Sequence, residues 1–156
     1  MHCSIHRPSP FIQAHSAHLL PDWCLPVGSV LVVLQRCEVP LQETNDITET
    51  WKDELRGHFI HLALPIVMQL EAWNHLAEIF DPRTGLPLRS RCGPLPLDDV
   101  AVVRSVLRYP TLDCGGCEVV LHPCWQTAVY PSVVLSSAHP IVMEAVVTMA
   151  QLQFGQ

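Results

Sequence analysis

Two cysteines separated by two glycines are the residues most suited to chemistry in this sequence. Cys114 and Cys117 flank Gly115 and Gly116, and this Cys-x-x-Cys spacing serves either thiol–disulfide chemistry or half of a zinc site. Thioredoxin-like enzymes place the pair at the start of a helix, whereas here the residues that follow favour a strand. Zinc needs two further ligands, for which His122 and Cys124 are the local candidates. Their spacing does not match a common zinc knuckle, and a thiol without a chemical role is the third interpretation.

Other catalytic patterns are missing. The nine histidines lie mostly in the N-terminal quarter or in a helix, where His58 and His61 are three residues apart. The sequence contains no glycine-rich nucleotide loop, no His-Glu-x-x-His and no Gly-x-Ser-x-Gly. We therefore expect a protein that is not an enzyme, with no catalytic residues and no resident metal site.

Composition narrows the class of protein. The chain has 156 residues, of which 49% are hydrophobic and 15% charged, which is typical of one globular domain. Its net charge is -6, and its basic residues are scattered arginines with a single lysine, Lys52. Binding to nucleic acid or to an anionic membrane needs clustered positive charge, so neither is expected. No apolar run approaches the roughly 20 residues of a membrane span.

The cysteines indicate a reducing compartment. There are seven, an odd number, with no signal-peptide core before them, which favours free thiols inside a cell. We expect a cytoplasmic protein. The first 21 residues lack acidic residues and hold one arginine, Arg7. This composition is a weak signal for import into mitochondria, which are the alternative compartment.

The positions of these residues depend on the elements around them. Residues 1–27 hold four prolines and predict an irregular lead with a mobile start and at most a short helical turn at 11–20. Residues 30–34 predict a central strand, and acids before Trp51 predict a helix start. Apolar residues then recur every three or four positions to Ala77, with two helices or one sharp kink expected at Pro65.

The second half alternates loops, strands and helices. Residues 81–99 predict a proline-rich loop and residues 98–107 a short helix. Strands are expected at 118–122 and at 125–135, paired as a hairpin or meander, with Pro131 at an edge or bulge. A mostly buried helix from Pro140 closes the chain. The order predicts an α+β fold in which one domain, residues 28–156, has a mostly antiparallel sheet with flanking helices.

Two segments of the chain resemble a known family. Residues 80–86 (FDPRTGL) and 116–127 (GCEVVLHPCWQT) are similar to the Asp-Pro-x-Ser/Thr-Gly-Leu segment and the Gly-Cys-Cys turn, strand, His and Trp of the CblD family. This is the family of methylmalonic aciduria and homocystinuria type D proteins, and the resemblance covers about residues 28–142.

The resemblance implies a fold and a function. The fold would be a truncated relative of the flavin-dependent nitroreductases without a working flavin site. The function would be that of a non-enzymatic adapter in intracellular cobalamin (vitamin B12) trafficking. Such adapters bind the cobalamin-processing protein CblC and direct cobalamin to methionine synthase in the cytosol or to methylmalonyl-CoA mutase in mitochondria. Cobalamin would be shared in the complex, with no cofactor bound by the chain alone.

The resemblance also implies site residues. Cys117 is the candidate thiolate ligand of cobalt, and Gly115 and Gly116 give backbone room for the corrin ring. The family's adjacent cysteines are Gly116 and Cys117 here, so Cys114 is the alternative ligand. The partner surface is expected at residues 98–113 and the glycine-rich turn. The family's long N-terminal extension has no counterpart before the domain, which favours the cytosolic branch.

Two other classes of function stay open. A flavin-binding reductase with the nitroreductase-like fold would need a phosphate site, for which Arg89 and Arg91 are the only close basic pair. A small zinc-bound interaction module would be built on the Cys-x-x-Cys pair with His122 and Cys124.

Overall fold

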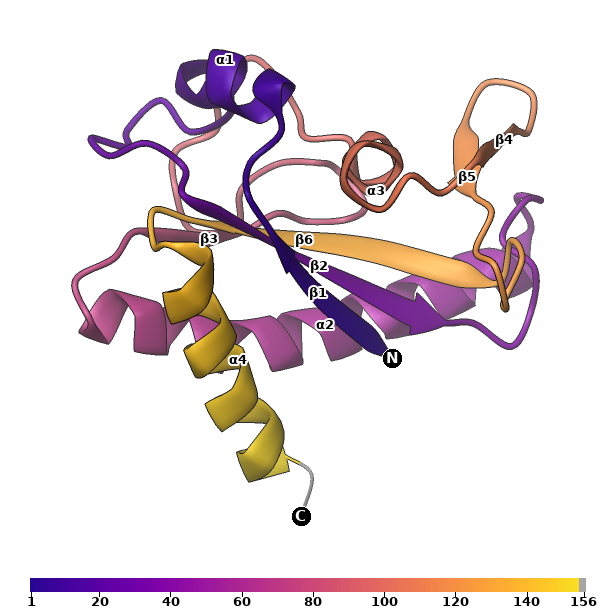
Figure 1. Cartoon of the computed structure of the whole chain (residues 1–156). Helices are drawn as coiled ribbons and strands as arrows, with labels where there is room; N and C mark the ends of the chain where they lie inside the picture. Colours follow the sequence, from indigo (N-terminus) through magenta and orange to yellow (C-terminus); the bar gives the residue numbers. More distant parts are fainter. Residues whose placement is uncertain (155–156) are drawn as a thin grey trace.

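Helices cover both faces of one antiparallel sheet (Figure 1). The computed structural model describes residues 1–154, and side chains for residues 1–152. The elements are β1 (His2–His6), α1 (Pro10–Leu19), β2 (Ser29–Arg36), α2 (Asp46–Ala72), β3 (Ala77–Ile79), α3 (Asp99–Leu107), β4 (Thr111–Asp113), β5 (Glu118–Val120), β6 (Val129–Ser136) and α4 (Pro140–Phe154).

The main sheet has the strand order β1-β2-β6-β3, and each neighbouring pair is antiparallel. β2 lies inside the sheet, as predicted for residues 30–34, and β4 and β5 form a separate two-stranded hairpin. The predicted single-domain α+β fold with a mostly antiparallel sheet is therefore confirmed.

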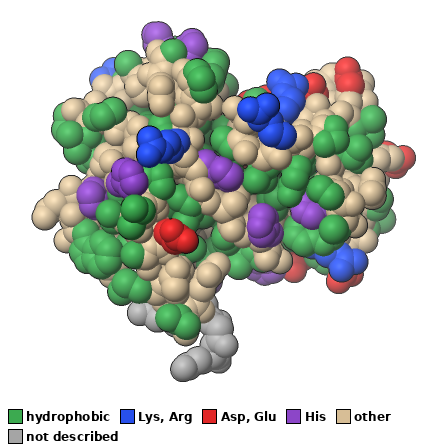
Figure 2. Space-filling view, in the orientation of Figure 1, with side chains coloured by type: hydrophobic (Ala, Val, Ile, Leu, Met, Phe, Trp, Pro, Cys, Tyr) green, Lys and Arg blue, Asp and Glu red, His purple; other side chains and the backbone are tan. Residues whose placement is uncertain are grey.

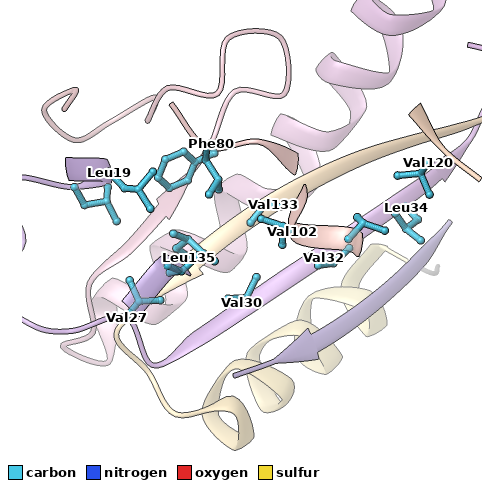
Figure 3. Packing of buried hydrophobic residues seen from close by; sticks show 14 of the residues in the cluster. Leu19, Val27, Val30, Val32, Leu34, Phe80, Val102, Val120, Val133 and Leu135 are labelled. Carbon is cyan, nitrogen blue, oxygen red and sulfur yellow. The ribbon is translucent and has the colours of Figure 1, made fainter. Parts of the chain in front are cut away.

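The alternation of β2 fills two hydrophobic cores. Val30, Val32 and Leu34 pack in one core with residues of α1 and α3, and Figure 3 shows part of this cluster. Leu31 and Val33 pack in the other core with residues of α2 and α4. Because a strand exposes alternate side chains to opposite faces, a continuous apolar run suits a strand that is covered on both sides.

The long helix α2 differs from its prediction at Pro65. It begins after Asn45, whose side chain accepts hydrogen bonds from the Ile47 and Thr48 backbone amides and forms a capping box with Thr48. It then continues through Pro65 as one element to Ala72, so of the two expected alternatives the division into two helices is wrong, and the kinked single helix stays a prediction. Residues on both sides of the proline, including Ala63 and Ile66, are buried against the sheet, and this packing offsets the lost backbone hydrogen bond.

The first 27 residues are not an irregular lead. β1 pairs along its whole length with β2, for example Ser4 with Val32. Ser9 caps α1, which has Pro10 at its first position and spans ten residues rather than one turn. The five residues of β1 have too weak an apolar pattern to predict a strand. The strand is formed by its pairing with β2, which lies more than 20 residues further along the chain. The domain therefore includes residues before 28.

The strands near the C-terminus pair differently from the prediction. β5 pairs with β4 rather than with β6, while β6 joins the main sheet between β2 and β3. β6 is an inner strand and not the edge strand expected from Pro131, but β3 pairs only with the C-terminal part of β6, so Pro131 has no β3 partner beside it. α3 forms where predicted, with Asp98 as its cap. α4 is only half-buried, because Ile141 and Leu152 are each 70% exposed.

Candidate functional site

The glycine-rich turn joins β4 and β5 at the tip of a projecting hairpin (Figure 1). The Cys114 amide donates to the Cys117 carbonyl over 2.8 Å. Gly115 and Gly116 have φ values of 77° and 116°, which glycine adopts at little cost. A Cβ atom on either glycine would meet nothing within 4 Å, so the backbone here is open on its outer side.

The base of the hairpin is held against the domain. Val120 is buried in the core cluster that contains α3 residues, and the Leu121 amide donates to the Pro110 carbonyl over 2.8 Å. Arg104 of α3 pairs with Glu118 of β5 at 3.2 Å. The turn therefore projects from a fixed base that places Cys117 next to the domain.

The two thiols of the turn have different surroundings. Cys117 is exposed and lines a cavity of about 540 Å³. Cys114 is half-buried, with its Sγ atom 3.7 Å from the Leu112 carbonyl oxygen. Burial, and then the charges of Cys117 and Asp113, raise the pKa of Cys114. Cys117 is therefore better placed than Cys114 to offer a sulfur to a large ligand.

The cavity forms beside the part of β6 that extends beyond the short strand β3. β3 ends at Ile79 while β6 continues from Val129 to Ser136, so the N-terminal part of β6 lacks a neighbour on that side. Pro131 has no backbone N–H that this edge would leave unpaired. Four groups of residues line the cavity: 82–85 after β3, 96–100 at the start of α3, 117–120 of the hairpin, and 129–131 of β6, with Leu41, Glu49 and Lys52.

The segment 81–85 is a tight turn that forms one wall of this cavity. The Gly85 amide donates to the Asp81 carbonyl over 2.7 Å. The Asp81 carboxylate accepts two hydrogen bonds of 2.8 Å from Arg56 and one of 2.9 Å from the Arg83 amide. The hydrogen bond from Arg56 is the main cause that lowers the pKa of Asp81. Asp81 therefore shapes the turn and is not free to act on a ligand.

Gly85 ties this turn to the loop before α3. Its φ is 70°, and a Cβ atom there would lie 2.4 Å from the Leu97 carbonyl oxygen. The Leu97 amide donates to the Gly85 carbonyl over 2.8 Å. Only glycine fits this position without a shift of backbone, which explains why the motif has glycine here.

Two buried polar side chains line the cavity and were not predicted from the sequence. Asp99 is 8% exposed and Tyr130 is 6% exposed. Neither the Asp99 carboxyl oxygens nor the Tyr130 hydroxyl has a hydrogen-bond partner among the residues that the structure describes. Burial, with the charges of Asp98 and Asp81, raises the pKa of Asp99 well above its ordinary value, and burial also raises the pKa of Tyr130. Both side chains thus lie in the wall of the cavity, with their polar atoms shielded from solvent.

The predicted zinc ligands do not come together. His122 is buried, and its Nδ1 atom accepts hydrogen bonds from the Cys124 and Trp125 amides, each 3.1 Å long. Its ring stacks on Trp125 with the centroids 4.1 Å apart. Within residues 1–154, no three His, Cys, Asp or Glu side chains form a group that could hold a metal ion. His122 instead organises the loop between the hairpin and β6.

One member of the basic pair considered for a flavin phosphate, Arg89, pairs with another side chain. The Arg89 guanidinium donates two hydrogen bonds to Glu71, of 2.6 and 3.0 Å, and neither Arg89 nor Arg91 lines the cavity. On the face shown in Figure 2, Lys and Arg side chains lie in a few separate places, with the largest group of them at the upper right of the view. Among the described residues, no helix is long and apolar enough to cross a membrane.

Comparison with known proteins does not identify a family. No model of a protein family matches the sequence, and no curated protein is similar enough to count as a relative.

Proposed function

We propose that this protein is a non-enzymatic adapter in intracellular cobalamin trafficking, as the resemblance to the CblD family implies. One observation carries the proposal. The two segments of the resemblance, 80–86 and 116–127, are about 30 positions apart in the sequence, yet Pro82, Arg83, Thr84 and Gly85 of the first and Cys117, Glu118, Val119 and Val120 of the second line the same cavity. Residues that serve one binding site are expected to converge in this way.

Cys117 supplies the chemistry of this function. A thiolate is a soft ligand, and cobalt in its +2 state accepts one at an open axial position. On coordination the sulfur donates an electron pair to cobalt and the thiol proton leaves to solvent, so no change of oxidation state is needed. Metal coordination itself favours the thiolate, and a neighbouring base is not required.

The surroundings of Cys117 suit a broad, flat ligand. The cysteine is exposed next to two glycines that carry no side chains and face open space. A second hollow, of about 590 Å³, is lined by Asp98, Asp113, Gly116, Cys117 and Glu118. A corrin ring bound to a CblC-like partner could approach the sulfur from this side without meeting a side chain of the turn.

The fold and the compartment belong to the same proposal. The relation to the flavin-dependent nitroreductases depends on the resemblance to the CblD family alone, and the pairing of Arg89 with Glu71 gives no support to a flavin phosphate site. Cobalamin would pass from the CblC-like partner to methionine synthase in the cytosol or to methylmalonyl-CoA mutase in mitochondria.

Size-exclusion chromatography tests the proposal. The purified protein is mixed with a CblC-like protein, with and without cobalamin, and co-elution is expected when cobalamin is present. Leu112→Glu, on the hairpin, should weaken co-elution, whereas Leu25→Glu should not. These leucines are 42% and 47% exposed, and Leu25 lies between α1 and β2, away from the hairpin. Absence of co-elution under every cobalamin condition would overturn the proposal.

A further inference from the structure

The two edges of the main sheet differ in how they are covered. At the β3 edge, the Leu88 amide donates to the Ile79 carbonyl over 3.0 Å, and the Glu78 carboxylate accepts a hydrogen bond of 3.1 Å from the Arg89 amide. The loop after β3 therefore covers that edge. At the other edge, β1 pairs with β2, and in the part of the chain that the structure describes no strand pairs with its outer side. β1 is thus the open edge of the sheet.

The hydrogen-bond register shows which backbone groups this open edge presents. The Cys37 amide donates to the Ala128 carbonyl over 2.9 Å, which continues the register of β2 with β6. Because bonded pairs alternate along an antiparallel ladder, the odd-numbered residues of β2 bond to β6 and the even-numbered ones to β1. β1 therefore bonds to β2 through its own even-numbered residues. The N–H and C=O groups of Cys3 and Ile5 point outward from the sheet.

A groove lies beside this edge, between β1 and α4. Its volume is about 360 Å³, and it is lined by residues 3–5 of β1 and by residues of α4 that include Ile141, Glu144 and Val147. Ile141 is 70% exposed, and the β1 side chains that pack toward α4 are only partly buried. An extended chain that pairs with β1 would place alternate side chains over this groove, as in the addition of a strand to a sheet edge.

Charge and the nature of the edge favour a second copy of this chain as the occupant. The chain carries a net charge of -6, and like net charge opposes the association of two copies in general. β1 is an exception, because its sequence HCSIH contains no Asp, Glu, Lys or Arg, and Glu144 is the one such residue that lines the groove. Edge strands are commonly protected by lysine, proline or a bulge, and β1 has none of these.

We propose that two copies of this protein join through β1, so that the sheet continues from one copy into the other around a two-fold axis at Ser4. In this antiparallel register Cys3 of each copy lies opposite Ile5 of the other, and each such pair exchanges both N–H···O bonds. It is the register that pairs all five residues of both strands. The side chains of these residues then lie over the groove of the other copy, where Ile141 offers an apolar surface. The interface shares no residue with the cavity that Cys117 lines, so it is independent of the proposed function.

Sedimentation equilibrium tests whether the chain pairs with itself. The purified protein is measured over a concentration series at pH 8 with a reducing agent, which prevents dimers linked by disulfides. A pairing of two short strands is small for a protein interface, so we expect a weak dimer. The mean mass should rise with concentration from the monomer value toward twice that value. A mass that stays at the monomer value up to millimolar concentration would overturn the proposal.

Proline at Cys3 tests the backbone pairing. Cys3→Pro removes an N–H that points outward and does not bond to β2, so the edge strand should still form. We expect this variant to stay monomeric. Cys3→Ala is the matched control, because it removes the same thiol but keeps the N–H, and it should associate as the wild type does. Thermal unfolding checks that both variants are folded. Association of folded Cys3→Pro equal to that of the wild type would contradict the proposed pairing.

A pair of charged variants at Ser4 tests the occupant and the register. Ser4→Lys and Ser4→Glu each place like charges next to one another at the two-fold axis, where the two Cα atoms would be about 4.5 Å apart. Each variant alone should be monomeric, and an equimolar mixture should associate because opposite charges then meet. A mixture that stays monomeric, or either variant alone associating as the wild type does, would overturn the assignment.

A different occupant has its own signature. If the wild type is monomeric and Cys3→Pro, but not Cys3→Ala, loses co-elution with the CblC-like protein, the edge binds that partner and the second copy is the wrong occupant. Failure of all co-elution with the CblC-like protein would overturn the proposed function, whereas the concentration series still decides the dimer.

Discussion

Asp99 is the first residue of α3 and lies buried against the cavity, with Asp98 beside it and Asp81 and Tyr130 near enough to interact with its charge. Its pKa is raised mainly by burial. A carboxyl group whose pKa is higher in the folded state than in the unfolded state destabilises the fold at high pH. Asp99 therefore has no such effect at pH values below its ordinary pKa of 3.8. As the pH rises above this value, Asp99 destabilises the fold progressively.

Asp99→Asn should therefore stabilise the protein at neutral pH. We expect the free energy of unfolding to rise by about 1–3 kcal/mol at pH 7 and to change little at pH 3.5, because asparagine cannot ionise. Urea unfolding at both pH values measures the difference.

Asp98→Asn is a comparison variant with a smaller expected gain, because the charge of Asp98 raises the pKa of Asp99 less than burial does. Asp98 is exposed, and its carboxylate caps α3 by accepting a hydrogen bond from the Ala101 amide, a role that asparagine fills equally well. A gain from Asp99→Asn of the same size at both pH values would contradict the account of its burial.

Residues of this kind mark the limit of sequence reasoning. The pair of aspartates correctly predicted a helix start, but not that the second is buried. Its burial depends on the turn at 81–85 and on β6, which are distant in the sequence. Cys117 was singled out because its spacing to Cys114 is local, and the structure leaves its role as a cobalt ligand a prediction.

At the scale of elements, glycines mark where backbone geometry shapes the cavity. Gly85→Ala should destabilise the protein by about 1–3 kcal/mol, because its positive φ and the Leu97 carbonyl 2.4 Å from the new Cβ leave no room. Gly57→Ala, inside α2 with nothing within 4 Å of the new Cβ, should instead stabilise by about 0.5–1 kcal/mol. Thermal unfolding of both variants measures whether each substitution lowers or raises the stability. A Gly85→Ala variant as stable as the wild type would refute this role of the turn.

Elements with a strong local pattern were predictable, and those made by pairing were not. The predictions for β2, α3 and the start of α2 depended on apolar periodicity and on capping residues. β4 has only three residues and exists because it pairs with β5 across the glycine turn. The continuation of α2 through Pro65 likewise depends on the sheet beneath it, which no local rule describes.

At the scale of the whole molecule, the N-terminal segment is part of the fold. β1 completes one side of the main sheet, and Ile12, Leu19 and Leu20 are buried in the core. A chain that starts at Gly28 should fail to fold, because the lost burial approaches the whole stability of a domain, about 5–15 kcal/mol. Far-UV circular dichroism during heating would show no cooperative transition.

Single substitutions in α1 also test whether the N-terminal segment is part of the fold. Leu19→Ala should lower the free energy of unfolding by about 2–5 kcal/mol, while Phe11→Ala, at a half-exposed position of the same helix, should cost far less. A chain without residues 1–27 that unfolds at the wild-type temperature would show that the lead is separate from the domain.

The absorption spectrum of the ternary mixture tests the proposed bond between the Cys117 thiolate and cobalt. The protein, a CblC-like partner and cobalamin reduced to the cobalt +2 state are mixed without oxygen. We expect a thiolate-type spectral change with the wild type and with Cys124→Ser, which replaces an exposed cysteine outside the cavity. We expect no such change with Cys117→Ser, which keeps its fold. If the change survives in both Cys117→Ser and the Cys114→Ser, Cys117→Ser double variant, neither thiol is the cobalt ligand.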